Sequence, residues 1–159
     1  MHTDYKYLGF LKEYVDYYGF KRACTPEDVD KIEQRLGVRF PLCYRELYLI
    51  LGVFGAFAFR SVMDFVYDEY EEMWAFSKEI TSADGHSFLE DKNVFVFAAW
   101  GVTSVCWFFK LDEGDDPPVY MYESPADSYV KVLDNLSEFI KLEDWYLAYL
   151  TDRAAKRNG

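Results

Sequence analysis

Histidine, cysteine and carboxylate side chains carry most protein chemistry, and this sequence is poor in the first two. Its histidines are His2, near the N-terminus, and His86, in a polar stretch, so a thiol nucleophile would have few bases to activate it. The cysteines, Cys24, Cys43 and Cys106, have spacings typical of neither a zinc site nor a C-x-x-C redox pair. We therefore expect buried structural thiols in a reducing compartment, and no catalytic residue.

Carboxylates, by contrast, are abundant: 28 Asp and Glu residues outnumber 17 Lys and Arg residues, and the formal net charge is −11. Two acidic groups contain or adjoin tyrosines. The first is Asp68, Glu69, Glu71 and Glu72 with Tyr67 and Tyr70, and the second is Asp112, Glu113, Asp115 and Asp116 with Tyr120, Tyr122 and Glu123 beside it. Tyrosines among carboxylates can anchor an interface whose charges steer a basic partner, which makes both groups candidate partner-binding residues. The alternative is a pair of solvated faces that keep an aromatic-rich protein soluble.

Charge and composition argue against several other functions. Direct binding to nucleic acid or to an anionic membrane depends on clustered Lys and Arg, which an excess of carboxylates opposes. The longest uncharged run, residues 47–59, has 13 residues and includes two glycines, whereas a membrane helix needs about 18 apolar residues. The N-terminus has no basic-then-apolar secretory signal, which predicts a cytoplasmic protein. The sequence has no glycine-rich phosphate loop and no metal-binding histidine pair, so we expect no cofactor and no metal.

Three helices are predicted before the first strand, over residues 8–18, 26–36 and 41–51. Thr25 and Pro26 are typical of a helix start, and Gly37 is typical of a helix end because glycine adopts the left-handed conformation without steric conflict. Pro41 suits the first turn of the next helix, whose apolar residues recur with helical spacing. The short corner between the second and third helices can be buried, and we expect the rest of the chain to pack around it.

The remainder of the chain predicts a sheet with one inserted helix. Strands are predicted over residues 53–60, 94–100, 104–111 and 119–123, with a short extended piece at 130–132. A helix over 64–80 carries the first acidic group, and a polar loop over 81–92 follows, pinned to the body by Phe88 and Leu89. A closing helix, capped by Ser137, extends to Leu150.

Helices come first, then a central antiparallel or mixed sheet, then a closing helix, without regular βαβ alternation. This order indicates the α+β class, and the length of 159 residues fits a single domain over residues 1–159.

Three segments, in the right order, resemble the SMI1/KNR4, or SUKH, superfamily. Ile32, Leu36-Gly37, Phe40-Pro41, Tyr44 and Tyr48 are similar to its amphipathic helix followed by Leu-Gly-x-x-Leu-Pro-x-x-Tyr; residues 118–122 resemble its Pro-Pro-Val-Tyr strand, and residues 135–140 its closing segment. The chain departs from the family in having Leu51-Gly52 where Asn-Gly is usual, and in a longer, more acidic stretch over 64–92.

The resemblance implies a binding function, because many bacterial members of the family are immunity proteins that neutralise toxins, often nucleases, of polymorphic toxin systems. It therefore implies a non-catalytic protein whose acidic surface binds a basic toxin domain, such as a nuclease. The alternative from another class is a regulatory scaffold, as in fungal members. An uncharacterised enzyme is the third hypothesis, since carboxylate pairs can perform acid–base catalysis when their separation in space is right.

Overall fold

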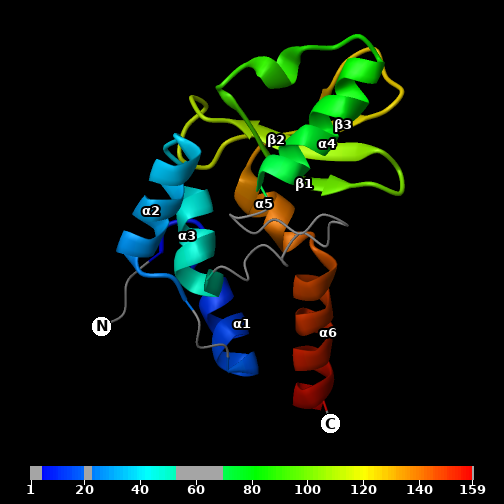
Figure 1. Ribbon diagram of the computed structural model, residues 1–159. Helices are drawn as coiled ribbons and strands as arrows, with labels where there is room; N and C mark the ends of the chain where they lie inside the picture. The colour runs from blue at the N-terminus through cyan, green and yellow to red at the C-terminus, as the bar shows by residue number, and fades with distance from the viewer. Residues whose placement is uncertain (1–4, 20–22, 53–69, 159) are drawn as a thin grey trace.

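The computed structural model describes residues 5–19, 23–52 and 70–158 of the chain. Three helices come first: α1 (Leu11–Tyr18), α2 (Pro26–Leu36) and α3 (Leu42–Leu51). They confirm the three helices predicted from the sequence, although Pro41 lies at the N-cap of α3 and not inside its first turn. Figure 1 shows α2 and α3 side by side at one end of a sheet, with α1 below them.

Local sequence explains the boundaries of α2. The Thr25 side chain accepts a hydrogen bond from the backbone N–H of Asp28, and the Asp28 carboxylate accepts one from the N–H of Thr25, which together form a capping box. Gly37 ends the helix with a φ of 69°, in the left-handed region that glycine adopts without strain. The corner that follows is buried at Phe40, as predicted.

Among the described residues, the sheet has four antiparallel strands in the order β1-β2-β3-β4. They are β1 (Val94–Trp100), β2 (Val105–Lys110), β3 (Val119–Glu123) and β4 (Val130–Leu133). The predicted strands over 94–100, 104–111 and 119–123 therefore share one sheet, and the piece near 130–132 is its fourth strand. The strand predicted over 53–60 lies outside the described residues.

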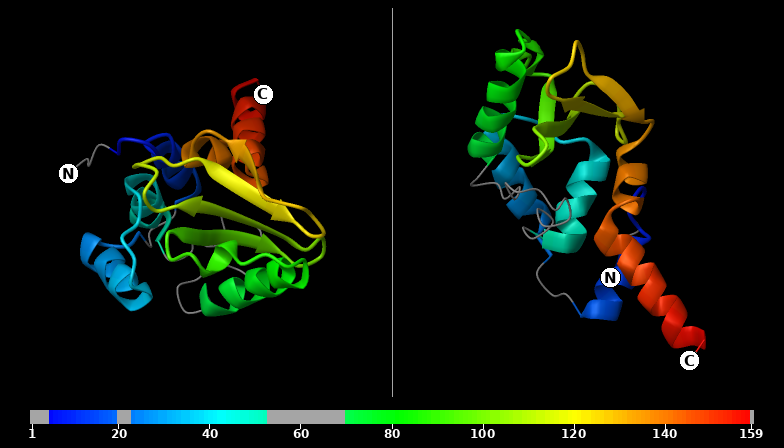
Figure 2. Two further views of the ribbon diagram at one scale, coloured as in Figure 1. Left: turned by 90° about the horizontal axis from the view of Figure 1, so that it is seen from above. Right: turned by 90° about the vertical axis from the view of Figure 1, so that its right-hand side faces the viewer.

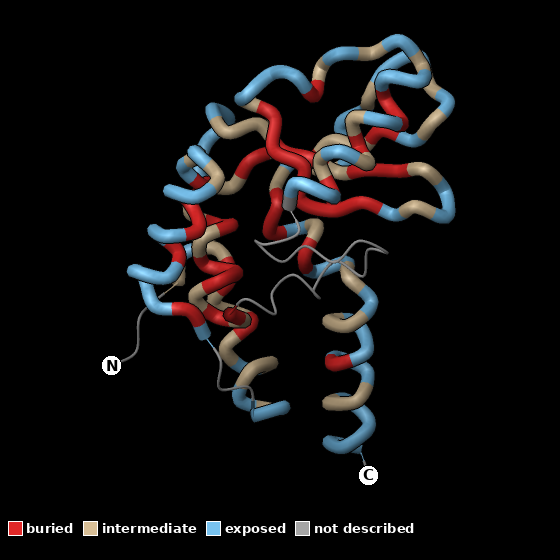
Figure 3. The backbone as a smooth tube through the Cα atoms, viewed as in Figure 1, coloured by how far each residue is buried: buried red, intermediate tan, exposed pale blue. Residues whose placement is uncertain are grey.

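Helices cover both faces of the sheet, which lies between α4 (Tyr70–Ala83) and α5 (Leu136–Lys141) in Figure 2. On the face toward α3, the rings of Phe40 and Tyr44 pack on Phe95 at 5.3 and 5.6 Å between centroids. On the same face, the ring of Phe139 from α5 meets Phe97. Buried residues accordingly concentrate on α3, β1 and β2 (Figure 3). The class is α+β, as predicted.

The inserted helix ends later than the sequence predicts. α4 continues past Ile80 to Ala83, and Thr81, which we placed in a loop, is buried inside the helix. Its Oγ1 donates to the backbone carbonyl of Ser77 at 3.0 Å, so the hydroxyl is satisfied without ending the helix. The polar segment behind it contains a single 3-10 turn, η2 (Phe88–Glu90), whose Leu89 is buried and pins the segment as expected.

The predicted closing helix is two helices, α5 and α6 (Asp144–Asn158). Ser137 is not the cap: Asn135 occupies the N-cap position of α5, and Ser137 binds the carboxylate of Asp116 instead. α6 extends away from the sheet beside α1 (Figures 1 and 2), where the ring of Tyr14 packs on Trp145 at 4.8 Å. Within the described ranges, no helix combines the length and apolar character that crossing a membrane requires.

Candidate functional site

The second acidic group forms the connection between β2 and β3, and we call residues 112–116 the acidic turn. Asp112, Glu113 and Asp115 are exposed, and Asp116 is half-buried. Gly114 has a φ of 95°, a conformation that lets the chain reverse between the flanking carboxylates. The turn thus presents three of its four carboxylates to solvent.

Asn93, just before β1, fixes the first end of the acidic turn. Its Nδ2 donates to Asp112 Oδ1 at 2.7 Å, and its Oδ1 accepts from the backbone N–H of Asp112 at 3.0 Å. Its backbone carbonyl also accepts from the N–H of Leu111 at 2.8 Å. Three hydrogen bonds to one asparagine therefore set the position from which the turn departs.

The other end is held by α3 and α5. The N–H of Cys43, at the start of α3, donates to the carbonyl of Asp115 at 2.8 Å. The Asp116 carboxylate accepts from the N–H and the Oγ of Ser137 at 2.9 and 2.6 Å, and its carbonyl accepts from Asn135 Nδ2 at 2.8 Å. Asp116 therefore anchors the turn. Its carboxylate is already hydrogen-bonded, so it is less available to a binding partner than the other three carboxylates of the turn.

Tyr120 lies against the acidic turn, as the sequence suggested. Its hydroxyl donates to Glu113 at 2.8 Å, and its ring lies 4.9 Å from the Lys110 ammonium. Burial first, and the Glu113 carboxylate second, raise the pKa of Tyr120. The hydrogen bond that the Lys110 ammonium donates to the Tyr129 hydroxyl oxygen is the first cause of the raised pKa of Lys110. Tyr120 thus holds Glu113 in place, beside a lysine that balances part of its charge.

Tyr122 does not belong to any exposed surface, because its side chain is 0% exposed. Its hydroxyl donates to Asp84, just past the end of α4, and to the carbonyl of Ala126. Burial and the Asp84 carboxylate raise the pKa of Tyr122 to about 12. We therefore leave Tyr122 out of the candidate surface, whereas Glu123, the next residue, is exposed.

The first acidic group is described only in part. Tyr67, Asp68 and Glu69 lie outside the described residues, and Tyr70 is the first residue of α4, with a side chain that is not described. Glu71 and Glu72 are exposed at the start of α4. Glu71 forms an ion pair of 3.1 Å with Arg35, near the end of α2.

A hollow of about 460 Å³ connects the acidic turn to the corner after α2. Its lining includes Gly37–Pro41 from the corner, Lys92 and Asn93 before β1, and Asp112 and Asp115 from the turn. Both acidic groups therefore border the end of α2, the first through Arg35 and the second through this hollow. The structure brings the two groups to neighbouring places at the end of α2.

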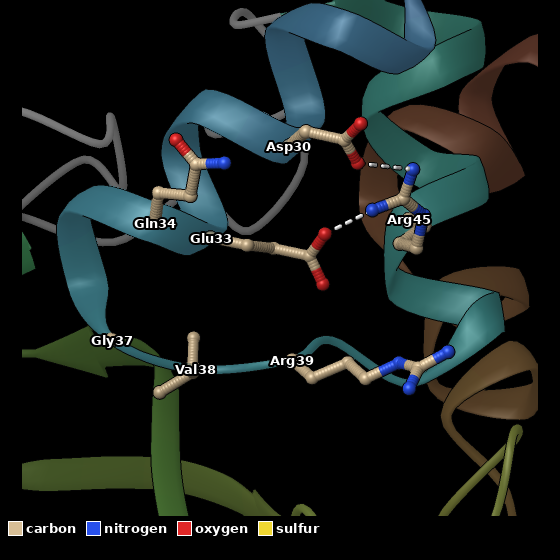
Figure 4. A pocket seen from close by; sticks show the side chains of 7 residues that line it. All are labelled: Asp30, Glu33, Gln34, Gly37, Val38, Arg39 and Arg45. Atoms are coloured by element: carbon tan, nitrogen blue, oxygen red, sulfur yellow. Dashed lines mark hydrogen bonds and ion pairs between the residues drawn. The ribbon is translucent and has the colours of Figure 1, made fainter.

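A second hollow, of about 840 Å³, lies on the other side of the corner, between α2 and α3 (Figure 4). Arg45 projects from α3 and pairs with Asp30 at 3.1 Å and with Glu33. Glu33 is 8% exposed and also accepts the N–H of Phe40 at 2.6 Å. These bonds fix the angle between the two helices.

Sequence reasoning missed the roles of two buried carboxylates. Glu33 is one, and Glu46 on α3 is the other: it is 2% exposed and accepts the backbone N–H groups of Lys6, Tyr7 and Leu8 at 3.2, 2.9 and 3.0 Å. The sequence could have indicated the burial of Glu46, because Tyr44, Leu47 and Tyr48 surround it on the apolar side of its helix.

All three cysteines are buried thiols, as predicted. Burial is the first cause of the raised pKa of Cys43, and burial raises the pKa of Cys106 to about 12, so both are thiols at neutral pH. Over residues 5–19, 23–52 and 70–158, no group of three or more His, Cys, Asp or Glu side chains is arranged to hold a metal ion.

Comparison with known proteins adds an independent finding. No curated protein matches the chain. The model of the SMI1/KNR4 family (SUKH-1) matches residues 23–142, a span that runs from the start of α2 to the end of α5 and contains the corner, the acidic turn and the whole sheet. α1 and α6, which pack against each other, lie outside it. This chain belongs to the SMI1/KNR4 (SUKH-1) family.

Proposed function

We propose that this protein is a non-catalytic immunity protein, which acts in the cytoplasm by binding a basic toxin domain and blocking it without chemical change. The SMI1/KNR4 family includes immunity proteins of polymorphic toxin systems. A net charge of −11 favours a basic partner, because opposite charges steer the encounter of two proteins and suppress wrong pairings.

The main support comes from the acidic turn, which is exposed and yet fixed at both ends. Asn93 holds Asp112, and the N–H of Cys43 holds the carbonyl of Asp115, so the carboxylates between them are already ordered. A preordered loop loses little conformational entropy on binding, and this raises the affinity that a given set of contacts provides.

A nuclease domain is the toxin class that fits this surface best. Its active site must be positive where it holds phosphate groups, and clustered carboxylates can occupy such a site through the same Lys and Arg side chains. Glu71 and Glu72 on α4 add exposed carboxylates near the end of α2, because Glu71 pairs with Arg35, and the hollow beside the acidic turn borders the same end of that helix.

The chemistry of the described residues supports binding more than catalysis. Buried thiols with raised pKa values are poor nucleophiles, since the thiolate is the reactive form. His86 is engaged at Nε2 by the carbonyl of Ala126 at 2.8 Å and stands beside Tyr122, which is itself buried.

Neutralising the acidic turn tests the proposal. Glu113→Gln with Asp115→Asn keeps side-chain shape and removes two charges, and the control pair Asp16→Asn with Asp127→Asn removes two exposed charges elsewhere. We expect the first pair to slow association with the cognate toxin domain, to be sought among the neighbouring genes, by about tenfold at low salt, and by less as salt screens the charges over a Debye length of about 8 Å.

Cells that produce the toxin should lose protection with the first pair and keep it with the control. Equal association rates for both pairs at every salt concentration would show that the turn is only a solubilising face. Binding to no toxin domain at all would instead favour the regulatory scaffold.

A further inference from the structure

The hollow beside the acidic turn is lined by charges of both signs, and we call it the mixed-charge hollow. Arg39 lines it from the corner and Lys92 from the segment before β1, whereas Asp112 and Asp115 line it from the acidic turn. The charged residues of this lining therefore balance, although carboxylates outnumber Lys and Arg residues by 28 to 17 in the whole chain.

These opposite charges are not paired with one another in the described part of the structure. Arg39 and Lys92 are both exposed, and neither forms an ion pair or a side-chain hydrogen bond with any described residue. The Asp115 carboxylate is also without a described partner, and Asp112 is bonded to the neutral side chain of Asn93. Both signs of charge are therefore available to a ligand.

Arg45, on the other side of the corner, shows the contrasting case. Its guanidinium is occupied by Asp30 and Glu33, as the dashed lines in Figure 4 show. Arg39 is drawn in the same view without a bond to the other residues. Both arginines line the hollow between α2 and α3, but Arg45 has a structural role there and Arg39 has no described partner.

A uniformly basic partner would fit this hollow poorly. Its cations would gain contact with Asp112 and Asp115 but would approach Arg39 and Lys92, and like charges brought together at an interface are unfavourable. A guanidinium fork is suited to a carboxylate, which it binds through two parallel hydrogen bonds. The best complement is therefore an acidic side chain flanked by basic ones.

We propose that the mixed-charge hollow is a specificity determinant that binds a partner segment in which one acidic side chain lies between basic side chains. The acidic side chain meets Arg39 and Lys92, and its basic neighbours meet Asp112 and Asp115. This inference rests on the proposed function, since it specifies the partner of the same acidic surface. It also gives Arg39 and Lys92 a role in partner choice that net charge alone would not assign.

Two short peptides of defined charge test the inference with the full chain. The first is Lys-Lys-Glu-Lys-Lys and the second is Lys-Lys-Gln-Lys-Lys, both with blocked ends, titrated into the isotope-labelled protein while backbone and side-chain amide NMR signals are followed. Simple attraction to an acidic protein favours the second peptide, which carries one more net positive charge. We expect the first to bind about fivefold more tightly, with shifts at Asn93 and the acidic turn.

Variants locate the effect. Arg39→Gln with Lys92→Gln should reverse the order of the two peptides, because the acidic side chain then has no cation to meet and only the attraction of the acidic turn remains. The control pair Lys31→Gln with Arg157→Gln removes the same two charges from exposed positions outside the hollow and should leave the order unchanged.

The outcomes separate the two proposals. Tighter binding of the glutamine peptide by the parent protein, or an unchanged order in the Arg39→Gln, Lys92→Gln variant, overturns the mixed-charge inference and leaves the acidic surface standing. Binding of neither peptide at the acidic turn overturns the acidic surface itself, and the inference with it.

Discussion

The two sides of the corner after α2 carry similar side chains and use them differently. On one side Arg45 pairs with both Asp30 and Glu33, and Glu33 also accepts the backbone N–H of Phe40. On the other side Arg39 and Asp115 line the mixed-charge hollow without any pairing among the described residues, and Arg39 also borders the hollow that holds Arg45. Charges that are paired with one another hold the helices together, whereas charges without a pairing at a fixed position are suited to a partner.

The same contrast separates the carboxylates of the whole chain. Glu46 is enclosed and accepts three backbone N–H groups, while Glu72 is exposed on α4 with no described partner. A buried acceptor of this kind stabilises the fold, because the N–H groups that donate to it would otherwise lose their hydrogen bonds to water on folding and gain none in exchange. An exposed one contributes little to folding and is free to serve binding.

Removing Glu46 should give the largest effect on stability. Glu46→Ala leaves the N–H groups of Lys6, Tyr7 and Leu8 without their acceptor, and we expect the free energy of unfolding to fall by about 3 kcal/mol. Urea denaturation measures the change. Glu72→Ala is the matched control and should stay within about 0.5 kcal/mol of the parent. Equal losses of unfolding free energy in both variants would contradict the distinction between buried structural carboxylates and exposed ones.

Breaking the paired side of the corner should have the next largest effect. Arg45→Met keeps the apolar stem and removes the cation from Glu33, whose side chain is only 10% exposed. Because Arg45 itself is partly exposed, we expect a loss of about 2 kcal/mol, less than for a fully buried pair. Arg39→Met, on the open side, should change stability by less than about 0.5 kcal/mol. A larger loss for Arg39→Met than for Arg45→Met would reverse our assignment of the two arginines.

Loosening the acidic turn should lower the free energy of unfolding by less than the two changes above, and it should clearly increase the local mobility of the turn. Ser137→Ala removes the hydroxyl donor to Asp116 and keeps the backbone N–H donor, so we expect a loss of about 1 kcal/mol. Amide hydrogen exchange over residues 112–116 should become faster. The exposed Ser128→Ala is the control, and unchanged exchange in Ser137→Ala would show that α5 does not order the turn.

The pH dependence of stability should show the smallest of these effects. Hydrogen bonds from Tyr122 first, and from Ser124 second, hold the pKa of Asp84 below its ordinary value of 3.8. The folded state therefore favours the ionised carboxylate, and its contribution is present above pH 3.8 and is lost as the pH falls through the lower folded pKa. In a plot of melting temperature against pH, Asp84→Asn should show a weaker fall in that acid range than the parent. Asp127→Asn should follow the curve of the parent protein.

Short-range patterns in the sequence determined the helices and strands of this protein. Thr25, Asp28 and Gly37 bound α2 through bonds and backbone angles within a few residues, so their effect can be derived without a structure. Alternating aromatic and β-branched residues likewise predicted β1, β2 and β3, and the order of elements predicted the α+β class. The motifs around the corner and β3 were enough to indicate the family.

Only the tertiary structure decided which charged residues are structural and which are open. Glu46 meets partners 38 to 40 residues away, Asp116 meets Ser137 at a separation of 21, and Tyr122 meets Asp84 at a separation of 38. A local pattern cannot distinguish these side chains from their exposed neighbours, because burial and hydrogen-bond partners depend on segments that become adjacent only when the chain folds. The mixed-charge hollow has the same origin: Arg39, Lys92 and Asp115 are far apart in the sequence, and the packing of the corner against the sheet brings them together.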